Sequence, residues 1–228
     1  MSEIFRALCE HGWLSDQPPA FREAVLRHGK TMRVARRQAI ACEGDADLRI
    51  FGVVSGSVGI YCSHRHDYPR IGTIIGPGKW FGEGPQMAGK PRFLTFIAAE
   101  NSVLLALGDN ELRAIAKDHP DLPQRLGHLA ETNAQFIAFI VSELLVPQTE
   151  RRMAAVLLRL CEWRREPVRL ALGQSELGEM INASRASVSR ALKRLETRGL
   201  LEVGYGTVTV PATAALEHYL EESTDCSD

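Results

Sequence analysis

Residues 172–199 read LGQSELGEMINASRASVSRALKRLETRG, and this stretch decides the fold of the C-terminal part of the chain. Apolar residues recur at helical spacing on both sides of a short break, which predicts two helices joined by a turn. At the break, Asn182 tolerates the left-handed conformation and Ala183 is small enough for a tight corner. Ser184 then caps the second helix and Gly199 ends it. The residues expected to face a core are Leu177, Met180, Ile181, Val188, Ala191, Leu192 and Leu195.

The outward face of the second helix is basic. Residues 184–198 hold five Lys or Arg residues and one acid. Arg185 and Arg190 lie on the first turns, where a helix in the major groove meets base edges, and a guanidinium suits bidentate contact with guanine. Ser184 and Ser187, together with the helix N-terminus, suit phosphate oxygens. The candidate DNA-binding residues are Ser184, Arg185, Ala186, Ser187, Ser189, Arg190 and Lys193.

The segments on either side of these two helices favour the same interpretation. Residues 151–162 predict an amphipathic helix, and residues 200–210 predict two short strands around Gly204-Tyr-Gly206, a small wing. The alternative is a hairpin of two helices with a solvated basic face. Because capping, turn, core spacing, basic exterior and wing all agree, we favour a winged helix-turn-helix that binds double-stranded DNA.

Length and composition indicate one large or two modest globular domains. The chain has 228 residues, of which 45% are hydrophobic and 24% charged, and no run approaches the length of a membrane span. The opening residues lack the pattern of a secretory signal, so we expect a cytoplasmic protein with no membrane partner.

The net charge is −1, but residues 151–200 carry eleven Lys or Arg against five Asp or Glu, and this local excess of positive charge suits the binding of a polyanion.

The cysteines do not predict a disulfide framework or a cysteine-based metal site. There are five, scattered and never spaced as C-x-x-C, so we expect buried or incidental thiols in a reducing compartment. Cys62, His64 and His66 alternate and would share a face of a hairpin, a geometry that suits a metal or haem. We favour the alternative, a solvent-exposed hairpin tip, and predict no metal site.

Residues 33–107 predict a β-rich domain. Runs of β-branched and aromatic residues are separated by Gly, Asp and Pro about every ten residues, which is typical of a sandwich or barrel. Within it, residues 78–84 read GKWFGEG, and Arg92 follows Glu83 by nine residues. Glycines let backbone amides approach a phosphate, the guanidinium pairs with its oxygens, and the carboxylate accepts from a ribose hydroxyl. A glycine-rich barrel corner with a surface arginine fits the spacing equally well.

Residues 122–143 predict a long helix with a broad apolar stripe. At ~1.5 Å per residue it is over about 30 Å long, more than one small barrel covers. A seam with a second copy of the chain is one interpretation, and packing against its own barrel is the other. We place the seam after Phe136. Pro147 interrupts the pattern, which places a hinge near residues 146–148.

Taken together, the chain resembles the Crp/Fnr superfamily of bacterial transcription regulators. The family's cyclic-nucleotide-binding-type barrel is resembled by the stretches EGD, VSGSV, PG and WFGE within residues 43–83, followed by Pro91-Arg92. Its winged helix-turn-helix is resembled by residues 172–210. The resemblance implies an α+β fold with an N-terminal antiparallel β jelly-roll barrel, a long dimerisation helix and a C-terminal winged helix-turn-helix. The domains that it implies are an effector-sensing domain at 1–121, a dimerisation helix and hinge at 122–147, and a DNA-binding domain at 148–228.

The resemblance also implies a function. A homodimer would bind a palindromic operator through the 184–198 helix, with RNA polymerase as a further partner and a small anionic effector controlling DNA binding. Ala186 stands where the family has an acidic base-reader, so the operator sequence does not carry over. The alternative function is a cyclic-nucleotide-type signalling module whose helix-turn-helix serves protein contact. No enzyme activity is predicted, because nucleophile-elbow, zinc-protease and P-loop motifs are absent from the sequence.

The barrel departs from the family pattern at its ligand site. Gly82, Glu83 and Arg92 match the ribose- and phosphate-binding positions, but the bulky Phe93 replaces a residue that is often small. The segment that would cap a purine reads Phe136-Ile137-Ala138, with no Thr or Ser to bond the base. Cyclic AMP, another anionic ligand and no ligand at all therefore stay open, and no cofactor is certain. The candidate effector-binding residues are Gly82, Glu83, Arg92, Phe93 and Ile137.

Overall fold

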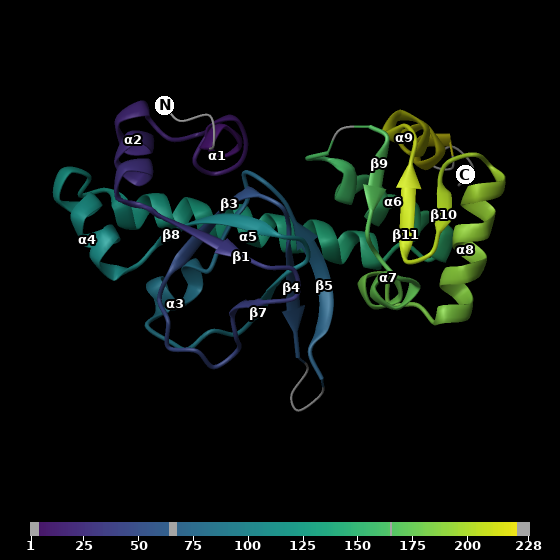
Figure 1. Ribbon diagram of the computed structural model, residues 1–228, viewed down its shortest axis with the longest axis horizontal. Helices are drawn as coiled ribbons and strands as arrows, with labels where there is room; N and C mark the ends of the chain where they lie inside the picture. The colour runs from purple at the N-terminus through teal and green to yellow at the C-terminus, as the bar shows by residue number, and fades with distance from the viewer. Residues whose placement is uncertain (1–4, 64–67, 165, 223–228) are drawn as a thin grey trace. The chain divides into compact units, whose positions relative to one another are not determined.

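The computed structural model describes residues 5–63, 68–164 and 166–222 (Figure 1). The chain divides into two compact units, Met1–Ile137 and Ala138–Asp228, and the boundary falls inside the long helix α5 (Leu122–Leu144). Unit 1 contains two antiparallel sheets, and unit 2 contains helices and one small sheet. The predicted α+β class is confirmed.

Eight strands of unit 1 form two four-stranded sheets in which every pairing is antiparallel, a jelly-roll barrel. The first sheet has the order β1 (Lys30–Val34), β8 (Ser102–Leu107), β3 (Ile50–Ser55) and β6 (Trp80–Phe81). The second has the order β2 (Ala39–Ala41), β7 (Thr95–Ala98), β4 (Val58–Cys62) and β5 (Arg70–Ile75).

Strand β3 is apolar at successive positions because both of its faces are covered. Phe51 and Val53 belong to the core between the two sheets, whereas Ile50 and Val54 belong to a second core under the helices. Between them, Gly52 leaves room for the indole of Trp80, since a Cβ there would lie 2.6 Å from the ring. A run that shows no alternation in the sequence is thereby a strand with two buried faces.

Helices of unit 1 cover the outer face of the first sheet. These are α1 (Arg6–Glu10), α2 (Pro19–His28), α4 (Asp109–Asp118) and the first turns of α5. The indole Nε1 of Trp13 donates to the carbonyl of Arg125 at 2.8 Å, which ties the N-terminal segment to α5. The short helix α3 (Glu83–Ala88) and helix α4 were not predicted from the sequence.

Unit 2 contains the predicted winged helix-turn-helix with two additions. Its elements are α6 (Thr149–Cys161), β9 (Val168–Leu170), α7 (Gln174–Met180), α8 (Arg185–Thr197), β10 (Glu202–Gly204), β11 (Thr207–Val210) and α9 (Thr213–Glu222). The predicted two-stranded wing has a third strand, since β9 pairs with β11 in the order β10-β11-β9. Helix α9 is the other addition, and it packs on α6.

The end of α5 is bound to α6 by charged groups. Arg159 Nε lies 3.0 Å from both carboxylate oxygens of Glu143, and both side chains are buried. Arg152 donates to the carbonyls of Leu144 and Val146, at 3.3 and 2.8 Å, and so satisfies groups that the helix end leaves unpaired. Helix α5 ends just before Pro147, where the sequence predicts an interruption.

Burial divides the described cysteines into two classes. Cys42 and Cys62 are exposed, and Cys9 and Cys161 are buried. Burial raises the pKa of the Cys161 thiol to about 12 and also raises the pKa of Cys9.

His64 and His66 lie outside the described residues, and the described residues contain no group of three or more His, Cys, Asp or Glu that would hold a metal ion. No helix in the described parts of the chain has the length and hydropathy to span a membrane.

We expect iodoacetamide to modify Cys42 and Cys62 in the native protein and to leave Cys161 unmodified until the chain unfolds. The thiolate is the reactive species, and a buried thiol with a raised pKa has little of it. Peptide mapping by mass spectrometry before and after denaturation measures this. Fast native labelling of Cys161 would show that α6 is not packed as described.

Candidate nucleic-acid interface and barrel pocket

A tight corner between α7 and α8 fixes the start of α8. The amide of Ala183 donates to the carbonyl of Gly178 at 2.9 Å, and Asn182 has the left-handed φ of +49°. A Cβ on Gly178 would lie 2.9 Å from the carbonyl oxygen of Ala183, so these two segments of the chain can approach this closely only if residue 178 is glycine. The sequence predicted the roles of Asn182 and Ala183 but not that of Gly178.

The first turn of α8 is held by its serines. Ser184 is the N-cap residue, and its Oγ accepts from the amide of Ser187 at 3.2 Å. The two hydroxyl groups lie 3.0 Å apart, and Arg190 donates to Ser187 Oγ at 3.1 Å. The guanidinium of Arg190 is therefore held beside the capped end of the helix.

Helix α8 separates its apolar and basic sides completely. Its buried residues are Val188, Ala191, Leu192 and Leu195, which face α6 and α7. Ser187 is half-buried, and the other six candidate DNA-binding residues are exposed: Ser184, Arg185, Ala186, Ser189, Arg190 and Lys193. The structure brings all seven to the outer side of one helix.

A cleft of about 500 Å³ adjoins this side, and we call it the basic cleft. Its lining residues are Glu150, Arg190, Lys193, Arg194, Thr197 and Arg198. Glu150 lies 3.6 Å from Arg194 and 3.5 Å from Arg198, and it accepts from the hydroxyl of Tyr219 at 2.9 Å. One carboxylate thus contacts two guanidinium groups, in a cleft whose lining includes four cationic side chains. The sequence did not predict this cluster.

A pocket of about 360 Å³ lies in unit 1, and we call it the barrel pocket. It is lined mainly by apolar side chains of the second sheet, β6, α3 and α5. All five candidate effector-binding residues line it: Gly82, Glu83, Arg92, Phe93 and Ile137. They meet although 55 positions separate the first and last of them in the sequence.

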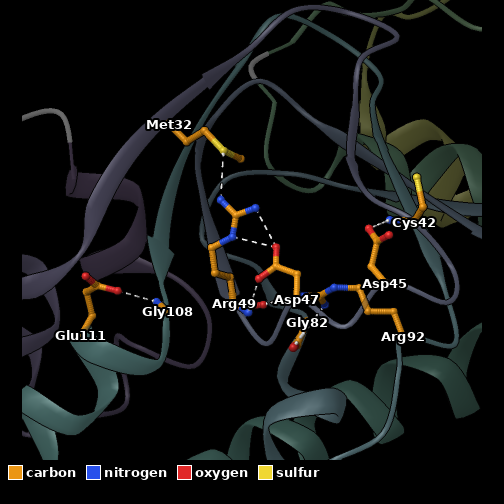
Figure 2. A network of polar contacts seen from close by, with 9 residues as sticks. All are labelled: Met32, Cys42, Asp45, Asp47, Arg49, Gly82, Arg92, Gly108 and Glu111. Atoms are coloured by element: carbon orange, nitrogen blue, oxygen red, sulfur yellow. Dashed lines mark hydrogen bonds and ion pairs between the residues drawn. The ribbon is translucent and has the colours of Figure 1, made fainter.

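Arg92 is buried rather than on the surface. It is 3% exposed, and its Nη2 donates to the carbonyl of Arg49 at 2.6 Å, while Nη1 lies 3.4 Å from the carbonyl of Gly82 (Figure 2). Its Nε is buried without a hydrogen-bond partner among the described residues. Burial lowers the pKa of this guanidinium, although Asp47, Asp45 and Glu83 act in the opposite direction. The surface-arginine alternative is therefore wrong.

The carboxylate of Glu83 already has a partner on α5. Asn133 Nδ2 donates to Glu83 Oε1 at 2.9 Å and to the carbonyl of Trp80 at 3.2 Å. On the same side of the pocket, the ammonium of Lys79 lies 5.1 Å from the centre of the Phe136 ring. The sequence did not identify Asn133 or Lys79, because neither belongs to a local motif.

The fold and the two sites together define a class of protein, in which a jelly-roll barrel with a pocket is connected by a long helix to a winged helix-turn-helix. A family model of the cyclic nucleotide-binding domain matches residues 31–119, and one of the Crp-like helix-turn-helix domain matches residues 151–219. The chain belongs to the Crp/Fnr superfamily of transcription regulators, which confirms the resemblance inferred from the sequence.

Known proteins of this kind match most of the chain. The cyclic AMP receptor protein of Thermus thermophilus is 29% identical over 175 residues, which are 77% of this chain and 81% of the relative. The structure of FixK2 from Bradyrhizobium japonicum is 20% identical, with a TM-score of 0.69 over 83% of this chain and 96% of that one. The c-di-GMP responsive global regulator CLP from Xanthomonas campestris is 22% identical, with a TM-score of 0.66 over 86% and 100%.

Replacing the cap residue tests the geometry of α8. We expect Ser184→Ala to lower the free energy of unfolding of the protein by about 1 kcal/mol, since one amide of the first turn loses its acceptor. Ser189→Ala is the matched control, because that serine is exposed in the middle of the helix and caps nothing. Urea unfolding compares the two. Equal stabilities of the two variants would contradict the capping role.

Proposed function

We propose that the protein is a dimeric, sequence-specific transcription regulator that binds a palindromic operator through α8, under the control of a small anionic effector in the barrel pocket. Residues 1–121 would sense the effector, 122–147 would join two copies and act as a hinge, and 148–228 would bind DNA. The partners implied are double-stranded DNA, a second copy of the chain and RNA polymerase.

The observation that carries the proposal is the outer side of α8. A helix that binds in the major groove needs exposed side chains that reach the base edges and an opposite side that packs on its own domain. Helix α8 has both, since Arg185 and Arg190 are exposed near its capped N-terminus and its opposite side is buried. Because Arg190 is held by Ser187, less side-chain freedom is lost on contact with a base. We assign Arg185 and Arg190 to base edges, Ala186 to a thymine methyl, and Ser184, Ser187, Ser189 and Lys193 to the positioning of the helix.

The basic cleft suits a backbone phosphate beside the groove. Arg194 and Arg198 are exposed, and Glu150 holds both of them. Phosphate contacts fix the register of a protein on DNA without reading sequence. We therefore assign base reading to Arg185 and Arg190 in the first half of α8, and phosphate binding to Arg194 in its second half and to Arg198, the residue after it, in addition to the serines of the first turn.

The second half of α5 supports dimer formation. The seam would contain Ala138 and Val141 of α5 and Leu145, the residue directly after the helix. They follow one another at spacings of three and four, the pattern of a coiled-coil seam. Val141 is 48% exposed and Leu145 is 74% exposed. Such neighbouring exposed apolar side chains indicate a surface that another protein chain covers. A second copy of α5 across a two-fold axis would cover them.

The barrel pocket supports an anionic effector. Arg92 is a buried cation, and none of the ion pairs formed between described residues includes it. A buried charge without a counterion is costly, and an anionic ligand would supply one. Relatives of this chain are named for cyclic AMP and for c-di-GMP, so the effector is not the same throughout the superfamily.

We expect Arg190→Ala to reduce discrimination between the selected operator and a scrambled duplex by about 1–3 kcal/mol, the range for a bidentate base contact. The matched control is Arg194→Ala, which should weaken binding to both duplexes equally and reduce the slope of log affinity against log salt by about 1. Fluorescence anisotropy over a salt series, on DNA selected from a random pool, measures both effects. Discrimination that survives Arg190→Ala, or a salt-independent affinity of the native protein, would favour protein contact over DNA reading.

We expect Val141→Glu to convert the dimer into a monomer, because the two-fold axis would place two carboxylates against each other. Ser142→Glu is the control, since it adds the same charge at an exposed position beside the seam. Sedimentation equilibrium measures the mass of both variants. A dimer that persists in Val141→Glu would place the interface elsewhere.

A further inference from the structure

The barrel pocket has a charged end and an apolar body. At the charged end, the Arg92 side chain is 3% exposed and its Nε has no partner among the described residues. Asp47, which lies near it, already bonds Arg49 at 2.6 and 2.7 Å. Asp47, Asp45 and Glu83 act on Arg92 electrostatically, but no ion pair formed between described residues includes it, so a negative group of a ligand would be its direct partner.

Apart from Lys79, Glu83, Thr132 and Asn133, the rest of the lining is mainly apolar. Phe81 and Phe96 form a packed aromatic wall, with ring centres 4.5 Å apart, and Ile75 is buried beside them. Phe93 lines the pocket yet is 74% exposed, so a ligand would cover it. These surfaces favour an apolar or aromatic body and offer it no hydrogen bond.

The few polar groups in the lining are already engaged with the protein. Glu83 accepts from Asn133, whose amide nitrogen also donates to a main-chain carbonyl. The hydroxyl of Thr132 donates to the carbonyl of His128 at 2.9 Å. Asn133 already occupies one oxygen of the Glu83 carboxylate, and apart from Lys79, Thr132 and Asn133 the side chains that a base edge would meet are apolar. Unpaired polar groups in such a pocket oppose binding.

The mainly apolar lining therefore favours a hydrocarbon body over the ribose and base of the cyclic nucleotide that this fold implies. We propose that the barrel pocket takes an amphipathic monoanion, with its acid group at Arg92 and an aromatic or branched hydrocarbon body against Phe81, Phe93 and Phe96. This inference rests on the proposed effector role of the pocket and names the chemical class of the ligand. A volume of about 360 Å³ is at the small end of ligand pockets, which suits one or two fused rings.

The test uses two probes that share a body and differ in charge. 8-Anilinonaphthalene-1-sulfonate carries one sulfonate, and N-phenyl-1-naphthylamine is the same molecule without it. We expect the sulfonate to bind the native protein once per chain and at least about tenfold more tightly than the neutral probe, as measured by fluorescence titration. Excess cyclic AMP should not displace it.

Three variants locate the site. Phe93→Ser should weaken both probes, and Phe139→Ser, which removes an exposed phenylalanine of α5 that does not line the pocket, should weaken neither. Arg92→Gln should abolish the preference for the sulfonate and leave the affinity of the neutral probe unchanged. Arg92 also bonds two main-chain carbonyls, so the Arg92→Gln variant could fail to fold. In that case, the comparison of the two probes on the native protein and the result for Phe93→Ser decide the question.

Three results would overturn the inference: equal affinity for the two probes, displacement of the sulfonate by cyclic AMP, or unchanged binding in Phe93→Ser. Selection of DNA from a random pool is scored separately. A protein that selects an operator but binds cyclic AMP in the pocket contradicts this inference alone. A protein that binds the sulfonate but selects no DNA contradicts the proposed regulator and leaves the chemistry of the pocket standing.

Discussion

The hydrogen bond from the Ala183 amide to the Gly178 carbonyl, at 2.9 Å, is the constraint on which the proposed DNA-binding surface depends. It closes the corner between α7 and α8, and the approach is close enough to require glycine at 178. The corner decides where α8 begins, and the Ser184 cap then decides the orientation of its first turn. With the apolar side buried against α6 and α7, the guanidinium groups have only the outer side available.

Unit 1 has a corresponding constraint in Arg92. Its burial requires acceptors, and the main-chain carbonyls of Arg49 and Gly82 provide two of them without neutralising the charge. Gly82 has a φ of +93°, and a Cβ there would lie 2.9 Å from the Arg49 carbonyl oxygen, so the glycine is needed for this cradle. The residues that form the β6–α3 turn thus hold Arg92 in the wall of the barrel pocket, where the proposed anionic ligand would bind beside the aromatic wall.

Local signals in the sequence predicted the parts of the fold that local physics determines. The left-handed Asn182, the cap at Ser184 and the end of α5 before Pro147 depend on backbone preferences of single residues, and the structure has them where expected. Pairings between distant residues were not predictable in this way. Tyr219 reaches Glu150 across 69 positions, and Asn133 reaches Glu83 across 50, so no spacing rule connects them. The strand β9 was missed for the same reason, since a three-residue strand is defined only by its partner β11.

In the proposed complex with DNA, α8 lies in the major groove with guanidinium groups at guanine N7 and O6. Dimethyl sulfate footprinting of the selected operator tests it most directly, because the reagent methylates guanine N7 from that groove. We expect two symmetric regions of N7 protection with centres about 10 base pairs apart, one for each copy of α8. Guanines that stay fully reactive in the bound complex would contradict it.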